Sequence, residues 1–560
     1  MIKKNIIRLL AVASVCMPLV SCEDVLDVNN EKKLSDLAVW SSADAGDMYV
    51  LASYKIFSDD AQLAGCRNKF WDSYSDISKS TSWSQYGHPY NTFILQGLNS
   101  GEFGAGAFEC WSDQYTRIRR ANVCLRDLYE YGSKFGDEYL KTRSAEIRLC
   151  RAYSYFMLAR VYGGVILRTE SSGTTGIDDG TFEEDVVRPR ATEAQTYRFI
   201  LDELNYAAEN LPEKLSGTWL RGRATKAFAY GLISRIALYA GLYSEAADAA
   251  QKVTDLGTAS LDPDFAKLFT PDGATSAEYI FNIRYQQGKL THQWDMSVRP
   301  GGDSNINGTG AYAEHVPTAE LCDLYEWNNG TPFSWNDWSA NHTDPFTDRE
   351  PRFQATVLYN GASWEGRTID ATVDGYDGYY KFEKTGSTGG KTCTGYFFRK
   401  FLQEGNTKFN VDMSTTPEPV MRYAEILLNQ AEALANVDFA ANKAKALDCV
   451  NKVRARVNLP AKDASSLEDF MKIIREERAK ELVGEGFRFW DLRRWRLAEA
   501  TLNGTMMHGV KITKSGDTFN YEVVDCDAGS NRIYPERYNY FSIPLSERSN
   551  NSACTNNPNW

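Results

Sequence analysis

The amino-acid sequence predicts a mostly α-helical protein built on tetratricopeptide-like helical hairpins, with a loop-rich irregular insert that contains short strands. Three observations support this fold class. Apolar residues recur at helical spacing in several long blocks, two pairs of these blocks are rich in alanine, and a segment rich in glycine, asparagine and aromatic residues separates the two pairs. We expect a single domain over residues 22–560, because stacked helix pairs share one continuous core.

The helical scaffold is predicted over about residues 35–257 and 418–500. Its expected helices lie at 35–57, 111–131, 139–162, 192–210, 225–240, 244–256, 419–436 and 440–457. The third of these helices stops at Gly163-Gly164 and the fourth before Pro212, because glycine and proline end helices. Small side chains in the two alanine-rich pairs allow the paired helices to approach closely.

Residues 262–413 form the predicted insert. This segment is rich in Gly, Asn, Asp, Thr and aromatic residues, and its candidate strands lie at 279–285 and 396–401. Residues 71–108, rich in Ser, Gly, Tyr and Trp, are also expected to form loops. Because loops carried by a rigid scaffold usually hold the binding residues, we expect the ligand to bind in these two regions.

The N-terminus has the pattern of an export signal. Three basic residues lie within the first eight positions, and the apolar stretch 6–20 that overlaps them is too short to span a bilayer comfortably. The stretch ends in Leu19-Val20-Ser21-Cys22, which resembles a lipobox. We therefore predict that residues 1–21 are a lipoprotein signal peptide and that Cys22 is lipidated, since several acyl chains on one cysteine give stable anchoring. A plain secretory signal with an incidental cysteine is the alternative.

Several functional classes lack support in the sequence. A formal net charge of −12 makes the chain a poor binder of nucleic acid. The five histidines form no HExxH motif, and neither a GxSxG elbow nor a P-loop is present, so we predict no catalytic residue and no metal centre. No cofactor is expected. The loop around Asp374 and Asp377 is a candidate for a structural calcium ion, with a solvated turn as the alternative.

The cysteines give no sign of a metal or redox motif. Nine follow Cys22, an odd number, and none forms a CxxC pair. Cys124, Cys150 and Cys449 lie on helical patterns among apolar neighbours, so we expect them to be small core residues.

Sequence motifs spread over most of the chain resemble the SusD/RagB family of outer-membrane nutrient-binding lipoproteins. They run in the family's order as Arg151-Ala-Tyr-Ser-Tyr-Phe156, Tyr162-Gly-Gly-Val165, Arg223-Ala-Thr-Lys-Ala227, Met421-Arg-Tyr-Ala-Glu425, Ile474-Arg-Glu-Glu-Arg478, Asp491-Leu-Arg-Arg-Trp495, Tyr540-Phe-Ser-Ile-Pro544 and Asn556-Asn-Pro-Asn559. One local departure is Ile166-Leu167, where the family usually has Pro-Leu. Each motif is of moderate specificity, but their order and the lipobox together make the resemblance strong.

The resemblance implies a binding protein rather than an enzyme. It implies capture of an oligosaccharide or polysaccharide at the cell surface and delivery to a SusC-like TonB-dependent transporter, over which the lipoprotein acts as a lid. It also implies an outer-membrane location with a lipid anchor. Glu23-Asp24, directly after Cys22, resembles the surface-export signal of lipoproteins in bacteria that use this family.

The resemblance further implies a shallow site formed by loops of the N-terminal part and of the insert. Aromatic rings stack on the apolar faces of sugars, and polar side chains bind the hydroxyls. Aromatic residues make up 13% of this chain, and most are expected in the core. The candidates for the glycan-binding minority are Trp71, Trp83, Tyr86, Trp294, Trp327, Trp335 and Trp338.

Two other functions stay open on the sequence. The same fold could bind peptides for uptake, with fewer ring platforms and more polar contacts. A surface glycoside hydrolase needs only two suitably spaced carboxylates, and 74 acidic residues do not exclude it.

The Glu- and Arg-rich stretch 477–495 is interpreted as structural. Residues three and four apart on a helix are neighbours, so Arg478 is expected to pair with Glu481, and Glu485 with Arg488. Acid–base catalysis by these side chains is the alternative that we consider weaker.

Overall fold

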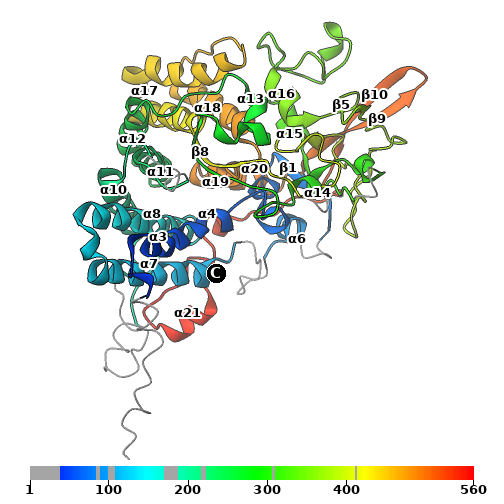
Figure 1. The fold of residues 1–560 in the computed structure, drawn as a ribbon. Coiled ribbons are helices and arrows are strands. Elements are labelled where there is room, and N and C mark those ends of the chain that lie inside the picture. Colours follow the sequence, from blue (N-terminus) through cyan, green and yellow to red (C-terminus); the bar gives the residue numbers. More distant parts are fainter. Residues whose placement is uncertain are drawn as a thin grey trace, which may run out of the picture.

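The computed structural model of the chain describes residues 38–83, 89–98, 108–169, 187–215, 222–305, 310–409 and 413–560. Helices dominate these residues and no strand among them exceeds 8 residues, so the predicted fold class is confirmed. Figure 1 shows the long helices gathered on one side of the molecule and the loops and short strands on the other.

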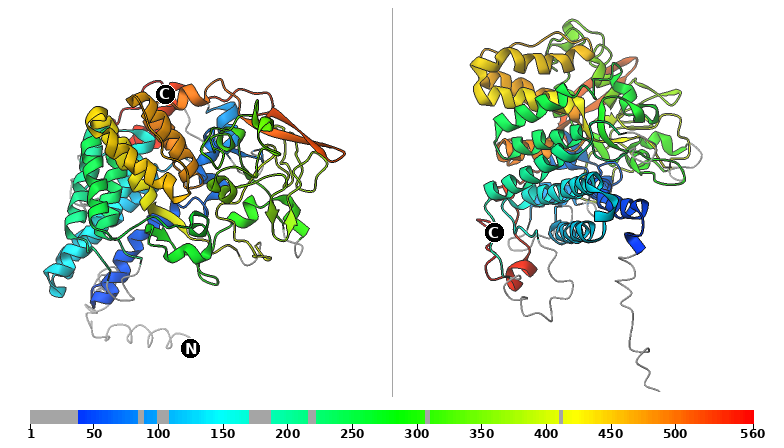
Figure 2. Two further views of the ribbon diagram at one scale, coloured as in Figure 1. Left: turned by 90° about the horizontal axis from the view of Figure 1, so that it is seen from above. Right: turned by 60° about the vertical axis from the view of Figure 1, so that its left-hand side comes forward.

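The long helices of the described residues form a stack in which each helix packs against the next one along the chain. They are α7 (Trp111–Tyr131), α8 (Asp137–Tyr162), α10 (Glu193–Asn210), α11 (Lys226–Tyr239), α12 (Tyr243–Asp255), α17 (Tyr423–Arg456) and α18 (Leu467–Leu482). Both views of Figure 2 show these helices side by side. Packing of successive hairpins around a shared core is the arrangement expected of a tetratricopeptide-like scaffold.

Caps and glycines fix the local geometry of the stack. Thr192 precedes α10 and forms a capping box with Gln195, whose backbone N–H donates to the threonine hydroxyl at 3.1 Å. α8 ends at Gly163, where φ is +74°, a conformation that favours glycine. A Cβ on Gly231 of α11 would lie 2.0 Å from the Met421 sulfur, so glycine is what allows this close approach.

Shorter helices occupy the rest of the described chain. They are α3 (Ala43–Leu51), α4 (Lys55–Asp59), α5 (Cys66–Lys69), α6 (Tyr90–Gln96), α13 (Phe265–Leu268), α14 (Trp294–Val298), α15 (Ala319–Cys322), α16 (Pro351–Thr356), α19 (Arg488–Arg494), α20 (Ala498–Leu502) and α21 (Leu545–Asn550). Among all helices of the described residues, none has both the length and the apolar content that a bilayer crossing requires.

Within the described residues the strands form small antiparallel pairs. The pairs are β1 (Ser78–Ser80) with β3 (His315–Pro317), β2 (Tyr279–Ile283) with β8 (Glu418–Arg422), β4 (Val357–Leu358) with β7 (Phe397–Phe398), β5 (Ser363–Trp364) with β6 (Arg367–Thr368), and β9 (His508–Ser515) with β10 (Thr518–Asp525). The first two pairs join the insert to segments before and after it. The β9–β10 hairpin, which the sequence analysis did not predict, projects from the molecule in Figure 1.

Three predictions of secondary structure need correction. The predicted helix over 35–57 is divided, in its described part, into α3, a short 3₁₀ turn and α4. Residues 71–108, predicted as loops, contain β1 and α6. Residues 419–422 belong to β8 rather than to a helix, because pairing with β2 carries Arg422 into a buried group of carboxylates. The break predicted between the helices at 419–436 and 440–457 is present: Asp438, inside α17, has a non-helical φ of −165°.

The cysteine prediction agrees with the structure. All nine cysteines in the described part of the chain are free thiols. Cys124, Cys150 and Cys449 are buried against apolar neighbours, as the helical pattern predicts.

A buried cluster of charged side chains holds the insert against the helices. Glu481 of α18 accepts hydrogen bonds from Arg422 of β8 at 2.6 Å and from Arg456 of α17 at 2.5 Å. It also accepts one from Arg352 of α16 at 3.0 Å, and the same guanidinium reaches Glu477 at 2.6 Å. These side chains are no more than 2% exposed. Because the partners come from α16, α17, α18 and β8, the cluster joins the insert to the end of the helical stack.

The Glu- and Arg-rich stretch 477–495 is part of this structural network, but neither ion pair predicted from its spacing forms. Arg478 pairs with Asp491 of α19 at 2.8 Å. Glu485 pairs with Arg422 of β8 at 2.8 Å. Each side chain therefore pairs with a residue outside α18, which the tertiary fold brings near, rather than with its predicted sequence neighbour.

We expect Glu481→Gln to lower the free energy of unfolding by about 3–5 kcal/mol, because Arg422 and Arg456 would lose their buried carboxylate partner. Glu522→Gln is the matched control, since Glu522 pairs with Lys511 at 3.1 Å on the surface of the β9–β10 hairpin. The Glu522→Gln substitution should lower the free energy of unfolding by less than about 1 kcal/mol. Urea denaturation followed by circular dichroism measures both changes, and equal effects would contradict the structural role of the cluster.

Stability should also fall in acid. Burial by itself would raise the pKa of Glu477, but Arg352, Lys480 and Arg454 lower it to about 2. The ordinary pKa of a glutamate is near 4.5, so the stabilisation from the lowered pKa is fully present above pH 4.5. It is lost as the pH falls from about 4.5 to 2, and the loss amounts to about 3 kcal/mol of unfolding free energy. Urea midpoints measured at pH 7, 5, 4 and 3 should decline over this interval, and Glu477→Gln should show a smaller decline.

Candidate functional site

Three of the predicted aromatic candidates are enclosed by protein. Trp294 is fully buried, and Trp71 packs edge-on against Trp490 with ring centroids 5.3 Å apart. Trp327 stacks on His342 with centroids 3.4 Å apart. As placed, these rings offer no free face on which a large ligand could stack.

Two more candidates lie together beside the β9–β10 hairpin. The ring centroids of Trp335 and Trp338 are 5.9 and 5.5 Å from that of Tyr521 on β10. The indole N–H of Trp335 donates to Asp323 at 3.1 Å. Burial raises the pKa of Asp323 to about 7 in spite of this hydrogen bond. Both tryptophans are half-buried, and Trp335 packs against the main hydrophobic core together with Tyr521.

Trp83 follows β1 and is half-buried, like Trp335 and Trp338. Its backbone N–H donates to the carbonyl of Gly386 at 2.7 Å, and its ring lies 6.4 Å from that of Phe382. Tyr86, the neighbouring candidate, and Cys22, the predicted lipidation site, lie outside the described residues.

The most exposed aromatic rings of the insert were not among the predicted candidates. Tyr312, Tyr376 and Tyr380 are 47%, 57% and 42% exposed. Exposed rings on neighbouring loops are a common mark of a binding surface. We refer to Trp83 and these three tyrosines as the aromatic surface.

Backbone hydrogen bonds connect the segments that carry the aromatic surface. Beyond the paired strands β1 and β3, Thr81 N–H donates to the carbonyl of Glu314 at 2.9 Å. Two residues on, Trp83 bonds Gly386 of the insert. Tyr312 lies two residues before Glu314 on the same connection. The N-terminal segment and two parts of the insert therefore meet here, although they lie far apart in the sequence.

Further contacts fix the segment that carries Tyr376. Asp377 accepts hydrogen bonds from Arg367 at 2.6 Å and from the backbone N–H of Gly302 at 3.2 Å. The same Arg367 binds Asp303 at 2.6 Å. A Cβ on Gly302 would lie 2.9 Å from Tyr376 Cδ1, so the tyrosine ring rests on this glycine. The ring is held in place although it is exposed, which reduces the ordering cost of binding.

These contacts bear on the calcium candidate. The carboxylate of Asp377 is already committed to Arg367 and to backbone N–H groups, while Asp374 is exposed. No group of three or more His, Cys, Asp or Glu side chains suited to a metal ion occurs within the described ranges. The calcium site stays a prediction, with one of its two carboxylates engaged in an ion pair.

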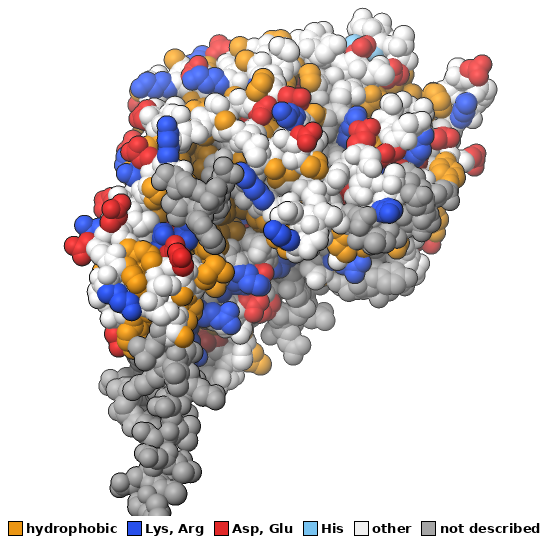
Figure 3. Space-filling view, in the orientation of Figure 1, with side chains coloured by type: hydrophobic (Ala, Val, Ile, Leu, Met, Phe, Trp, Pro, Cys, Tyr) orange, Lys and Arg blue, Asp and Glu red, His pale blue; other side chains and the backbone are white. Residues whose placement is uncertain are grey.

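The arrangement of the aromatic surface suits binding. Exposed rings can stack on an apolar ligand face, and glycines in the same loops allow close approach to the backbone. Polar side chains near the rings that can bind hydroxyl or amide groups are Lys381, Glu383, Lys384 and Ser387, all exposed. Figure 3 shows acidic and basic side chains interspersed over one face of the molecule, so that face has no strong field of one sign.

A sequence signal for the missed tyrosines does exist. The run Gly375-Tyr-Asp-Gly-Tyr-Tyr380 places three tyrosines among glycines in a loop-rich segment. Two of these three tyrosines, Tyr376 and Tyr380, are the ones left exposed.

Two family models match the chain. The model described as the SusD family matches residues 277–560, and one described as "Starch-binding associating with outer membrane" matches residues 24–238. A SusD-like protein of Formosa agariphila is 24% identical over 506 residues, which cover 85% of this chain and 88% of that protein.

Solved structures show the same architecture. A SusD-like protein from Bacteroides fragilis has a TM-score of 0.78 and 25% sequence identity, covering 93% of this chain and 98% of that one. A SusD-like carbohydrate-binding protein from the same species has a TM-score of 0.76 and 23% identity, covering 92% of this chain and 99% of that one. The second likeness supports the fold alone.

Tryptophan substitutions should separate the buried candidates from the aromatic surface. We expect Trp294→Ala to cost about 3–5 kcal/mol of unfolding free energy, because it leaves a cavity in the core. Trp83→Ala should cost less than half as much, since the ring is partly exposed. Chemical denaturation measures both, and a larger loss for Trp83 would show that its ring is a core element.

Proposed function

This chain belongs to the SusD family, and on that premise we propose that it is a cell-surface glycan-binding lipoprotein. It captures an oligosaccharide or polysaccharide and delivers it to a SusC-like TonB-dependent outer-membrane transporter, over which it acts as a lid. The observation that carries the proposal is the aromatic surface, where exposed rings lie on loops joined by backbone hydrogen bonds.

The chemistry of the aromatic surface favours a glycan. Sugars present apolar C–H faces bordered by hydroxyls, and Tyr312, Tyr376 and Tyr380 offer both ring faces and phenolic hydroxyls. A relative of the same fold is described as a carbohydrate-binding protein. Binding without turnover is the proposed role, because the exposed ring faces and hydroxyls provide contacts to a sugar.

The proposed location rests on the N-terminus and on the family. Cleavage after residue 21 would leave Cys22 as a lipid-bearing first residue, followed by the acidic pair Glu23-Asp24. One matching family model is described as associating with the outer membrane. An outer-membrane anchor would place the domain beside the transporter that receives the ligand.

A binding screen tests the proposal. The purified chain is titrated with a panel of polysaccharides and with peptides, by affinity electrophoresis and calorimetry, and the products are analysed for cleavage. We expect one glycan class to bind without being cleaved. Binding of peptides alone would favour a peptide-uptake protein, and cleavage of a glycan would show a surface glycoside hydrolase.

Substitutions then locate the site. Tyr376→Ala combined with Tyr380→Ala should raise the Kd for the bound glycan by about tenfold or more, because two stacking faces are lost. Tyr129→Ala is the matched control, since Tyr129 is similarly exposed but lies on α7 in the helical stack. Equal affinity of the double variant and the control would place the glycan elsewhere.

A further inference from the structure

Lys79 of β1 is a buried charge beneath the aromatic surface. Its side chain has no exposure to solvent, and neither has that of Asp527, to which its ammonium donates at 2.7 Å. The ammonium also donates to the side-chain oxygen of Asn91 at 2.6 Å, and it lies 4.1 Å from the centre of the Phe382 ring. A lysine ammonium has three N–H donors, so two hydrogen bonds and a ring face satisfy it without water.

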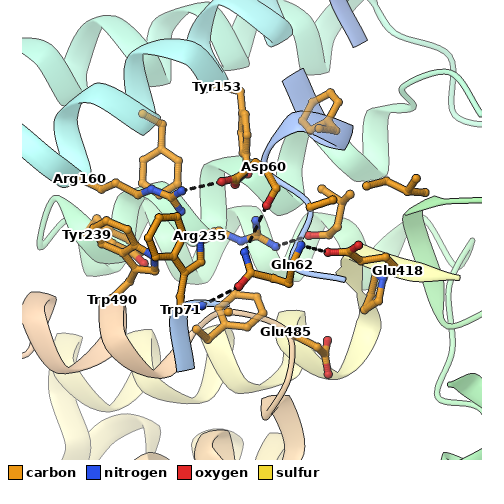
Figure 4. A pocket seen from close by; sticks show the side chains of 18 residues that line it. Asp60, Gln62, Trp71, Tyr153, Arg160, Arg235, Tyr239, Glu418, Glu485 and Trp490 are labelled. Carbon is orange, nitrogen blue, oxygen red and sulfur yellow. Dashed lines mark hydrogen bonds and ion pairs between the residues drawn. The ribbon is translucent and has the colours of Figure 1, made fainter. Parts of the chain in front are cut away.

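The charges drawn in Figure 4 have a different environment. There Asp60 accepts hydrogen bonds from Arg160 at 3.0 Å and from Tyr153 at 2.9 Å, beside a cavity of about 50 Å³. A polar cavity of that volume has room for water, which can take the place of a protein partner. The donors of Lys79 are already used by protein groups, so each of these groups must be in its place.

The three partners of Lys79 belong to different parts of the chain. Asn91 lies on α6, Phe382 lies in the insert, and Asp527 follows β10. Asp527 is itself held, because it accepts a hydrogen bond from Arg532 at 2.8 Å. The ammonium therefore connects the N-terminal segment both to the insert and to the C-terminal part of the chain.

Asn91 extends this arrangement to Trp83. Its amide nitrogen donates to the carbonyls of Ser80 at 2.9 Å and Ser82 at 2.8 Å, which lead directly to Trp83. The oxygen of the same amide group accepts from Lys79. Because a lysine can only donate, it fixes which way the amide faces, and with it the backbone that ends at Trp83.

Phe382 extends the arrangement to the insert. Its ring is buried, and the ring of Trp83 lies 6.4 Å from it. The exposed Tyr380 lies two residues before it in the same segment. A cation–π contact is stronger when it is shielded from water, so the ammonium holds this ring and the segment that carries it.

A buried ion pair is weak evidence for stability, since apolar side chains of similar size often stabilise a fold equally well. What this buried charge requires is one arrangement of its partners. We infer that Lys79 is a positioning residue of the aromatic surface, which holds Trp83 and the segment of Tyr380 in the arrangement that a glycan meets. The consequence for binding rests on the proposed function, whereas the positioning can be measured without a glycan.

The first test uses the full chain, free of any glycan, with the substitution Lys79→Met. Lys480→Met is the matched control, since Lys480 is 1% exposed and pairs with Glu326 and Glu477 in the scaffold. Amide hydrogen exchange over residues 80–83 and 380–386, relative to the amides of α8, should rise about tenfold or more in Lys79→Met alone. Equal exchange in the two variants would overturn the inference.

The indole N–H resonance of Trp83 gives a second readout of position. In the chain with isotope-labelled tryptophan, Lys79→Met should shift this resonance and leave that of Trp338 unchanged. Phe382→Leu covers the case in which Lys79→Met does not fold, because it removes the ring and keeps the ion pair with Asp527. It should shift the same resonance, and an unchanged Trp83 signal in the variants that fold would overturn the inference.

The effect on binding is tested with laminarin and soluble starch as polysaccharide probes. For a probe that binds the unchanged chain, Lys79→Met or Phe382→Leu should raise Kd about tenfold, and Lys480→Met less than about twofold. An unchanged Kd in the first two variants would overturn the role of Lys79 in binding. If neither polysaccharide binds the unchanged chain, that result counts against the proposed function, and hydrogen exchange still decides whether Lys79 positions the aromatic surface.

Discussion

Arg422 brings its guanidinium into a space enclosed by Glu278, Glu481 and Glu485, at 2.8, 2.6 and 2.8 Å, with almost no exposure to solvent. Burying such charges costs several kcal/mol for each ion unless geometry and hydrogen bonds compensate, so this space admits one arrangement of its partners. Glu278 precedes β2 in the insert, and the other two carboxylates lie at the end of α18 and just beyond it. The register of β8 against β2, and with it the attachment of the insert to the helices, depends on this set of ion pairs.

The same region also anchors the segment that leads to Trp83. Asp72 accepts a hydrogen bond from the backbone N–H of Gly484 at 2.6 Å, and Lys400 of the insert binds the carbonyl of Val483 at 2.8 Å and Glu485 at 2.7 Å. The connection after α18 thus holds both parts of the chain that carry the aromatic surface. A rigid scaffold with fixed attachment points allows exposed loops to vary in sequence while their positions are kept.

The sequence by itself determined the helical scaffold, because helical periodicity and the stop at Gly163 are local signals. The helix predicted over 111–131 is found with the same bounds. Only the tertiary structure decided that residues 419–422 form a strand, and that Arg478 pairs with Asp491 rather than within its own helix. It also decided which rings stay in water, since Trp294 is covered by Phe70 from the N-terminal part of the chain and Tyr376 rests on Gly302. A local pattern specifies which face of an element is apolar, but what covers that face is set by packing between distant parts of the chain.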